Sequence, residues 1–322
     1  NGEDQTLNPG VNDFYNVQFN NRGTKTFVAN GININNDMVI QGVFVDADPD
    51  YYDSVSVDFG NLTHYIGSNK VVVNSNSSWV TENANIYFDR GGDQYIPAIT
   101  VNNVTFANRG YKWLTGTLHA NDIVVQSSVN FRSSEDRNDP NDIYCAGAWE
   151  NNGTFVSWTN SVYFDAADTD NKIIKTNGDA FNNLFFNQTS TTARTYQMED
   201  NIRVNEELIV GNGATLKTEG HNLELGNDDP NDGFYPDGEE HTIELGGTIH
   251  VDAGGGILFD QNDMYPALTV FGTLKVVGVS GNNATLGQLA GGTRRGTRVN
   301  IESGAEVHFR FYNAEYLHYD GL

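Results

Sequence analysis

The chain lacks most features that mark helical, membrane-spanning or disulfide-bonded proteins. Its 322 residues include one cysteine, three methionines and seven prolines. The single cysteine, Cys145, excludes an intrachain disulfide, and we expect it to be a small apolar side chain in a core. No run of 18 apolar residues occurs, so the sequence predicts no membrane insertion. No long segment has apolar residues spaced three and four apart, which predicts that helix is almost absent.

Basic side chains are also scarce. The sequence has 18 Lys and Arg against 42 Asp and Glu, a formal net charge of −24. Such a charge repels polyphosphates, so we expect no nucleic-acid partner, and it favours solubility and divalent cations. The seven histidines are scattered, without the His-x-x-x-His or Cys-x-x-Cys spacing of zinc sites. No phosphate-binding loop occurs either, and the sequence predicts a protein that is not an enzyme.

Glycine, asparagine, aspartate and threonine are abundant, and 18 Phe and 15 Tyr supply much of the bulk. Apolar residues alternate with polar ones over short runs, as at Val17 and Phe19 or at Leu208 and Val210, which is typical of half-buried strands. Between the runs lie turn sequences such as Asn152-Gly153, in which glycine supplies the positive φ of a tight corner. The sequence therefore predicts many short strands.

A degenerate internal repeat organises these strands. Residues 16–25, NVQFNNRGTK, return 87 residues later as residues 103–112, NVTFANRGYK, and a weaker copy, NLFFN, occupies residues 183–187. Because other landmarks recur in the same order, we expect about four related modules, at approximately 1–97, 98–178, 179–266 and 267–322.

Two architectures fit this repeat: tandem β-sandwich domains, or a single solenoid in which each module forms several coils. A sandwich domain is normally bounded by a linker, yet no Pro-, Ser- or charge-rich linker separates the modules. The sequence therefore favours an all-β, right-handed parallel β-helix (β-solenoid) over residues 1–322. No polar capping helix is evident at either end, and we expect a fragment of a longer chain.

A family resemblance points the same way. The segments AWENNGTF (148–155), SVYFD (161–165), FNNLFF (181–186) and LIVGNGATL (208–216) resemble the β-helical repeat of large secreted, adhesin-like surface proteins of Bacteroidota. The resemblance covers most of the chain and carries no catalytic position. It implies an extracellular or cell-surface protein exported by the type IX route, with a signal peptide before this segment and a sorting domain after it.

Acidic turns are the best candidate metal site. Three Pro-containing turns recur about 90 residues apart. Clustered carboxylates are what calcium requires, although Asp and Asn are also ordinary turn residues. The calcium hypothesis names Asp48, Asp50, Asp139, Asp142, Asp229 and Asp232.

Other candidate binding features are weaker. Arg22 and Arg109, at the two Asn-Arg-Gly corners, would hold an anion if both lay on one face, but a glycine-dependent turn with a solvated arginine is the favoured interpretation. Aromatic residues near turns are candidates for stacking on sugar rings. They are Tyr51, Tyr52, Phe234, Tyr235 and Tyr265.

Two further features concern catalysis and modification. Asp165, Asp168 and Asp170 are the one acidic group directly after an expected strand, where a solvated strand end is the simpler interpretation. Asp53-Ser54-Val55 resembles the acceptor motif for protein O-glycosylation in the same phylum, which makes Ser54 a candidate site.

The sequence thus predicts an extracellular structural or adhesive surface protein, such as a stalk, adhesin or filament component. Its expected partners are surface glycans or other copies of itself, and no cofactor is expected beyond calcium. The alternative is a carbohydrate-active β-helix, either a polysaccharide lyase or hydrolase or a non-catalytic glycan-binding module. An enzyme of that kind needs charged residues that converge on neighbouring coils.

Overall fold

The computed structural model divides the chain into two compact units, which are described separately. Unit 1 comprises Asn1–Asp142 with Asn151–Thr154, and unit 2 comprises Ile143–Glu150 with Phe155–Leu322. The structure describes residues 4–10, 13–20, 22–29, 31–40, 55–73, 77–136, 141–165, 168–187, 192–226, 240–260, 267–289 and 298–314. No helix occurs among these residues, as the sequence predicts.

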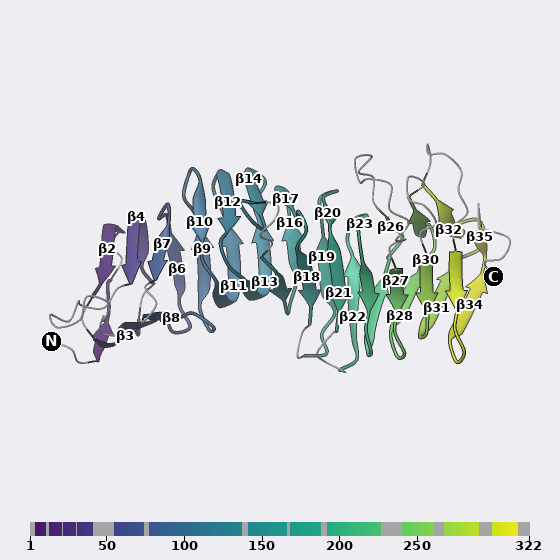
Figure 1. Cartoon of the computed structure of the whole chain (residues 1–322), viewed down its shortest axis with the longest axis horizontal. Helices are drawn as coiled ribbons and strands as arrows, with labels where there is room; N and C mark the ends of the chain where they lie inside the picture. Colours follow the sequence, from purple (N-terminus) through teal and green to yellow (C-terminus); the bar gives the residue numbers. More distant parts are fainter. Residues whose placement is uncertain are drawn as a thin grey trace. The chain divides into compact units, whose positions relative to one another are not determined.

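In unit 1 the strands form three stacks, in which each strand lies beside a strand of the next turn of the chain (Figure 1). Stack 1a contains β1 (Gln5–Leu7), β3 (Gly23–Phe27), β5 (Val55–Asp58) and β8 (Ser78–Val80). Stack 1b contains β2 (Asp13–Phe19), β4 (Asn33–Ile40), β6 (Thr63–Ile66), β9 (Asn85–Phe88), β11 (Ile99–Phe106) and β13 (Leu118–Val125). Stack 1c contains β7 (Val71–Val73), β10 (Gln94–Ile96), β12 (Gly110–Leu114) and β14 (Val129–Arg132), and it also takes in the second halves of β2 and β4.

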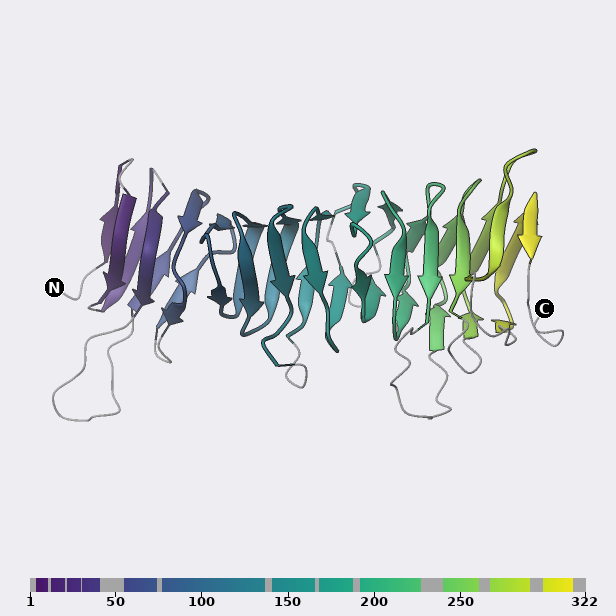
Figure 2. The same ribbon diagram turned by 90° about the horizontal axis from the view of Figure 1, so that it is seen from above.

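Unit 2 has three stacks of the same kind, which Figure 2 shows from above. Stack 2a contains β15 (Ile143–Cys145), β18 (Ser161–Phe164), β21 (Asn183–Phe186), β24 (Leu208–Val210), β27 (Glu240–Ile243), β30 (Ala267–Val270) and β33 (Arg298–Ile301). Stack 2b contains β16 (Trp149–Asn151), β19 (Lys172–Lys175), β22 (Arg194–Met198), β25 (Ala214–Lys217), β28 (Thr248–Val251), β31 (Thr273–Val277) and β34 (Glu306–Arg310). Stack 2c contains β20 (Ala180–Phe181), β23 (Ile202–Val204), β26 (Asn222–Leu225), β29 (Gly256–Phe259), β32 (Ala284–Gln288) and β35 (Tyr312–Ala314). The short strand β17 (Thr154–Val156) spans the sequence boundary between the units.

The ladders within these stacks are parallel, as between β9 and β11 in unit 1 and between β25 and β28 in unit 2. Parallel pairing of strands from successive turns is the arrangement of a β-helix, so the predicted fold class is confirmed. The tandem β-sandwich alternative is wrong, because sandwich sheets are built from antiparallel hairpins and Greek keys.

The apolar side chains that alternate along each strand fill the interior of the coil. In β9 the side chains of Ile86 and Phe88 are fully buried while their neighbours are only half-buried. Aromatic rings then stack from turn to turn, with Phe106 lying 6.0 Å from Phe88 and 4.1 Å from Phe131 between ring centroids. Cys145 is buried in unit 2 with 1% of its surface exposed, which confirms the prediction that it belongs to a core.

Asparagine has a defined role at the corners of stack 1b. The Asn103 amide donates to the Asn85 side-chain oxygen at 2.9 Å, and the Asn121 amide donates to the Asn103 oxygen at 3.2 Å. The Asn103 oxygen also accepts the backbone N–H of Asp122. This ladder satisfies corner groups on three successive turns, and it gives a role to Asn103, the asparagine that begins the second copy of the repeated block.

Two histidines interrupt the aliphatic interior, one in each unit. His64 and His241 have no exposed surface. The Nδ1 atom of His64 accepts the backbone N–H of Ile32 at 3.1 Å, and that of His241 accepts the N–H of Leu208 at 3.2 Å. Burial lowers the pKa of each imidazole to about 4, so both rings are neutral at pH 7 and serve as hydrogen-bond acceptors.

The copies of the sequence repeat do not occupy equivalent positions. Residues 16–19 pair with the second half of β4 and lie in stack 1c, whereas residues 103–106 pair with β9 and lie in stack 1b. The block therefore specifies a strand and the corner after it. It can occur on any side of the coil, because strands on all three sides need the same alternation of inward and outward side chains.

Candidate functional site

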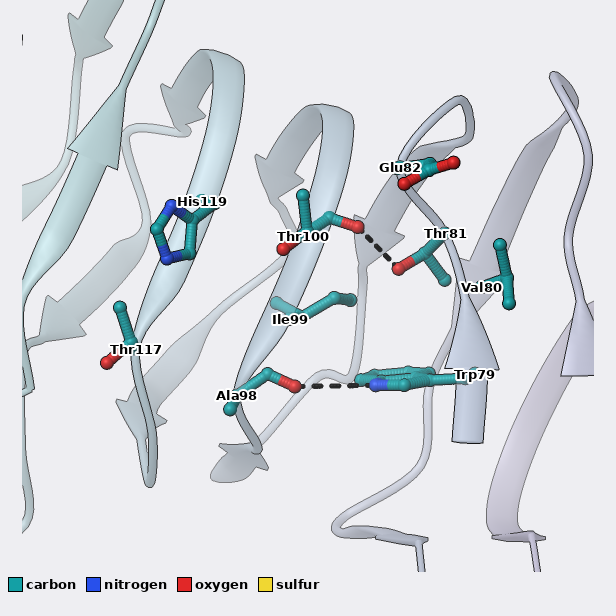
Figure 3. Close-up of a pocket in the computed structure, with 9 residues that line it drawn as sticks. All are labelled: Trp79, Val80, Thr81, Glu82, Ala98, Ile99, Thr100, Thr117 and His119. Atoms are coloured by element: carbon teal, nitrogen blue, oxygen red, sulfur yellow. Dashed lines mark hydrogen bonds between the residues drawn. The ribbon is translucent and has the colours of Figure 1, made fainter. Parts of the chain in front are cut away.

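A hollow of about 390 Å³ opens on the surface of unit 1 (Figure 3). Trp79 and Glu82 lie on one side of it, Thr117 and His119 lie on the other, and the start of β11 lies between them. Its lining comprises Trp79, Val80, Thr81, Glu82, Ala98, Ile99, Thr100, Thr117 and His119.

The hollow occurs where side chains replace a strand ladder. β8 is the last strand of stack 1a, and side-chain hydrogen bonds connect it to β11 on the next turn. The Trp79 indole Nε1 donates to the Ala98 carbonyl at 3.3 Å, and the Thr81 hydroxyl donates to the Thr100 carbonyl at 2.6 Å (Figure 3). A hydrogen bond made by a side chain holds two backbone segments farther apart than a direct backbone–backbone hydrogen bond does. This junction therefore leaves room between the turns.

The lining combines one aromatic ring with a polar rim. The Trp79 ring is half-buried and packs edge to face against Phe59, with 6.3 Å between ring centroids. Glu82, Thr100 and His119 are exposed at the rim. Partial burial lowers the pKa of His119, so its imidazole is neutral at pH 7 and can both donate and accept a hydrogen bond.

Charged residues of unit 2 converge on neighbouring turns. The guanidinium of Arg203 in β23 lies 3.0 Å from the carboxylate of Asp260, which directly follows β29. Glu224 lies on the intervening strand β26, in register with Arg203. Burial raises the pKa of Glu224, the Asp260 charge raises it further, and the Arg203 charge opposes both effects.

A second hollow in unit 2, of about 480 Å³, lies beside His250 and Arg310. Its charged groups already have partners, because His250 Nε2 lies 3.5 Å from an Asp252 oxygen and the Arg310 guanidinium lies 5.1 Å from the centre of the Phe311 ring. The remaining lining residues are Val277, Gly278, Val279 and Ser280.

Of the residues in the calcium hypothesis, only Asp142 is described. Its backbone carbonyl accepts the N–H of Leu118 at 3.1 Å. The others, Asp48, Asp50, Asp139, Asp229 and Asp232, lie outside the described residues, as does the candidate glycosylation site Ser54. Within the described part of the chain, no group of three or more His, Cys, Asp or Glu side chains could hold a metal ion. The calcium hypothesis stays a prediction.

The two Asn-Arg-Gly corners do not bring their arginines together. Arg22 precedes β3 in stack 1a and Arg109 precedes β12 in stack 1c. The glycines after them have φ values of 87° and 90°, as the turn interpretation requires.

Sequence reasoning missed the lysine that follows each of these corners. Lys25 and Lys112 point inward, with 3% and 0% of their surface exposed. Their ammonium groups donate to turn carbonyls, Lys25 to that of Arg22 at 2.9 Å and Lys112 to that of Arg90 at 2.6 Å. Burial lowers the pKa of Lys112 to about 8. The corner motif is thus structural in both copies.

Of the acidic group after β18, Asp168 and Asp170 are exposed, as expected of a solvated strand end, whereas Asp165 is half-buried. Asp168 is exposed and forms an ion pair of 2.8 Å with Lys172, and it also accepts the backbone N–H of Asp170. The aromatic residues proposed for sugar stacking, Tyr51, Tyr52, Phe234, Tyr235 and Tyr265, lie outside the described residues. Trp79 was not singled out, because its short segment has no turn or spacing signal that distinguishes it from a core strand.

Comparison with known protein families, with curated proteins and with solved structures finds no match. Among the described residues, no helix is long and apolar enough to cross a membrane.

Proposed function

We propose that this chain is part of an extracellular structural or adhesive surface protein, in which the β-helix is a scaffold. The observation that carries the proposal is the continuity of the stacks within each unit. Buried side chains such as Phe88, Phe106 and Phe131 contact one another from turn to turn, and polar ladders such as Asn85–Asn103–Asn121 line the corners. A body whose every turn is bonded to the next resists bending and local opening, which is the property that a stalk or adhesin requires.

The charge and the sequence resemblance support an extracellular location. A net charge of −24 keeps a large surface soluble and opposes self-association. The likeness to β-helical repeats of secreted Bacteroidota proteins implies export by the type IX route. We therefore expect the full-length protein at the cell surface, with surface glycans as its partners.

Protease treatment of intact cells that produce the full-length protein tests this proposal. An antibody against this segment should detect it on untreated cells, and protease should remove the signal while a cytoplasmic marker survives. Resistance of the segment to protease until the cells are lysed contradicts the surface role.

The Arg203–Glu224–Asp260 group favours a second candidate, a carbohydrate-active β-helix. Two carboxylates beside an arginine, one of them Glu224 with a pKa raised by burial, resemble the acid and base of a glycoside hydrolase or the charge-neutralising group of a lyase. In the scaffold proposal this group is an ion pair that links three turns and has no catalytic role.

Incubation with neutral and acidic polysaccharides separates the two candidates. The scaffold proposal predicts no new reducing ends and no unsaturated ends. The enzyme candidate predicts that such ends form with the parent chain and do not form with Glu224→Gln. The control is Glu150→Gln, which replaces an exposed carboxylate on β16 and should keep the activity.

We propose calcium as the ligand of the acidic turns, on the strength of their three copies and the excess negative charge. Melting with and without a chelator tests this. Calcium that binds only the folded chain raises the midpoint, and an unchanged midpoint removes the hypothesis.

A further inference from the structure

We propose that the hollow beside Trp79 binds one neutral pyranose ring of a surface glycan. The inference deepens the adhesive role proposed above and rests on it for its biological meaning. It identifies both the site and the chemical class of ligand that this role requires.

The Trp79 ring, which lines the hollow, is held in place before any ligand binds. The Trp79 indole is held by its hydrogen bond to the Ala98 carbonyl and by its edge contact with Phe59, so the ring cannot rotate away from the hollow. A rigid indole that is partly open to solvent offers an apolar face to the C–H groups of a sugar ring. Because the ring is already ordered in the free protein, binding loses little conformational freedom.

The rim provides hydrogen-bonding groups of both kinds. Glu82 is an acceptor, Thr100 and Thr117 carry hydroxyls that donate and accept, and the neutral His119 imidazole does both. Sugar hydroxyls also donate and accept, so each can find a partner at this rim. These side chains come from three successive turns and therefore surround the ligand instead of contacting it along one line.

Size and charge select the ligand. At about 390 Å³ the hollow lies near the lower end of the roughly 300–1,000 Å³ range of small-molecule sites, which suits a ligand as small as one sugar ring. Its lining contains no lysine or arginine, and Glu82 and the net charge of −24 oppose an anion. Sulfated, phosphorylated and uronic sugars are therefore excluded in favour of neutral ones. Two possible ligands, Glu82 and His119, are too few for a metal ion.

Titration of the whole chain with neutral oligosaccharides tests the proposal. The probes are oligomers of glucose, galactose, mannose and N-acetylglucosamine, with polygalacturonate and heparin as acidic counterparts, and calorimetry is the measurement. We expect at least one neutral probe to bind and both acidic probes to fail. Trp79→Ala should weaken binding at least tenfold, Trp79→Phe should restore most of it, and Thr100→Val should weaken it severalfold.

Tyr111→Ala is the matched control, because Tyr111 is a 39% exposed aromatic of unit 1 whose ring is covered by the Arg132 guanidinium at 4.6 Å. It should bind like the parent chain. Should Trp79→Ala fail to fold, as judged by circular dichroism, Thr100→Val and Glu82→Gln carry the test. Absence of binding to every neutral probe, or equal binding by folded Trp79→Ala, overturns the inference.

The outcomes also separate this inference from the proposed function. A chain that protease removes from intact cells but that binds no neutral sugar refutes the sugar site and leaves the surface role standing. Sugar binding by a chain found only inside cells refutes the surface role and leaves the site.

Discussion

Two tryptophans, one in each unit, occupy opposite environments. Trp149 of unit 2 is 1% exposed and packs edge to face against Phe155 and Phe181, with ring centroids 4.9 and 5.3 Å away. Its strand forms a regular ladder with β19. Trp79 of unit 1 lies on the last strand of stack 1a, where its indole bonds to a carbonyl of the next turn and lines a hollow. A continuous ladder makes an indole part of the core, whereas an interrupted ladder makes it part of a surface site.

The largest expected effect is the loss of the buried tryptophan. Trp149→Ala removes a ring that fills the interior of unit 2, so we expect it to lower the free energy of unfolding by about 3–5 kcal/mol. Trp79→Ala removes the hydrogen bond to the Ala98 carbonyl and the edge contact with Phe59, and should lower the free energy of unfolding by about 1 kcal/mol. Urea unfolding followed by circular dichroism measures both. Equal losses contradict the distinction between core and surface indoles.

Acid should destabilise both units through their interior histidines. His64 and His241 have a pKa of about 4 in the folded chain and about 6.5 when unfolded, so the unfolded chain binds more protons between these values. Their contribution to stability is complete above pH 6.5 and is lost as the pH falls towards 4, by up to about 3 kcal/mol for each histidine. Protonation also removes the acceptor at Nδ1 for the N–H groups of Ile32 and Leu208.

Melting temperatures from pH 7 to pH 4 measure this effect. His241→Asn should flatten the pH dependence, while His308→Asn, an exposed histidine, should leave it unchanged. A pH profile that is the same in all three chains refutes the role of the buried imidazole.

Two glycines sharpen the comparison between crowded and open corners. Gly110 and Gly178 both have positive φ, at 90° and 83°, so alanine is strained at either position. A Cβ at Gly110 would lie 2.6 Å from the Gly92 carbonyl carbon of the preceding turn, whereas a Cβ at Gly178 meets nothing within 4 Å. We expect Gly110→Ala to lose about 1–3 kcal/mol more than Gly178→Ala, as measured by urea unfolding. The reverse order contradicts the close approach of turns at Gly110.

The fold was predictable because its determinants are local. Alternation such as that of Ile86 and Phe88 specifies a half-buried strand, and the glycine after Arg109 specifies a corner, so the strands and corners followed from the pattern. The choice of a parallel β-helix over tandem sandwiches rested instead on the absence of a linker sequence between the modules. The side of the coil on which a strand lies did not follow. All three sides impose the same alternation, and the repeated block accordingly appears in stack 1b and in stack 1c.

The candidate site was not predictable for a different physical reason. Trp79, Thr100 and His119 come from three successive turns, and their proximity depends on the register between turns, which no local pattern records. The same holds for Arg203 and Asp260, which are 57 residues apart in sequence. Lys112 was missed because its ammonium group donates to a carbonyl of the preceding turn, whose position the sequence does not reveal.

Cross-linking between turns tests the parallel register most directly. In a Cys145→Ala background, Thr215→Cys with Thr248→Cys joins positions that are paired on neighbouring strands, about 4.8 Å apart and within disulfide range. Thr215→Cys with Thr273→Cys spans two turns, about 9.6 Å, which exceeds that range. The structure predicts that mild oxidation cross-links the first pair and not the second. Efficient cross-linking of the second pair, or none of the first, would contradict the β-helix.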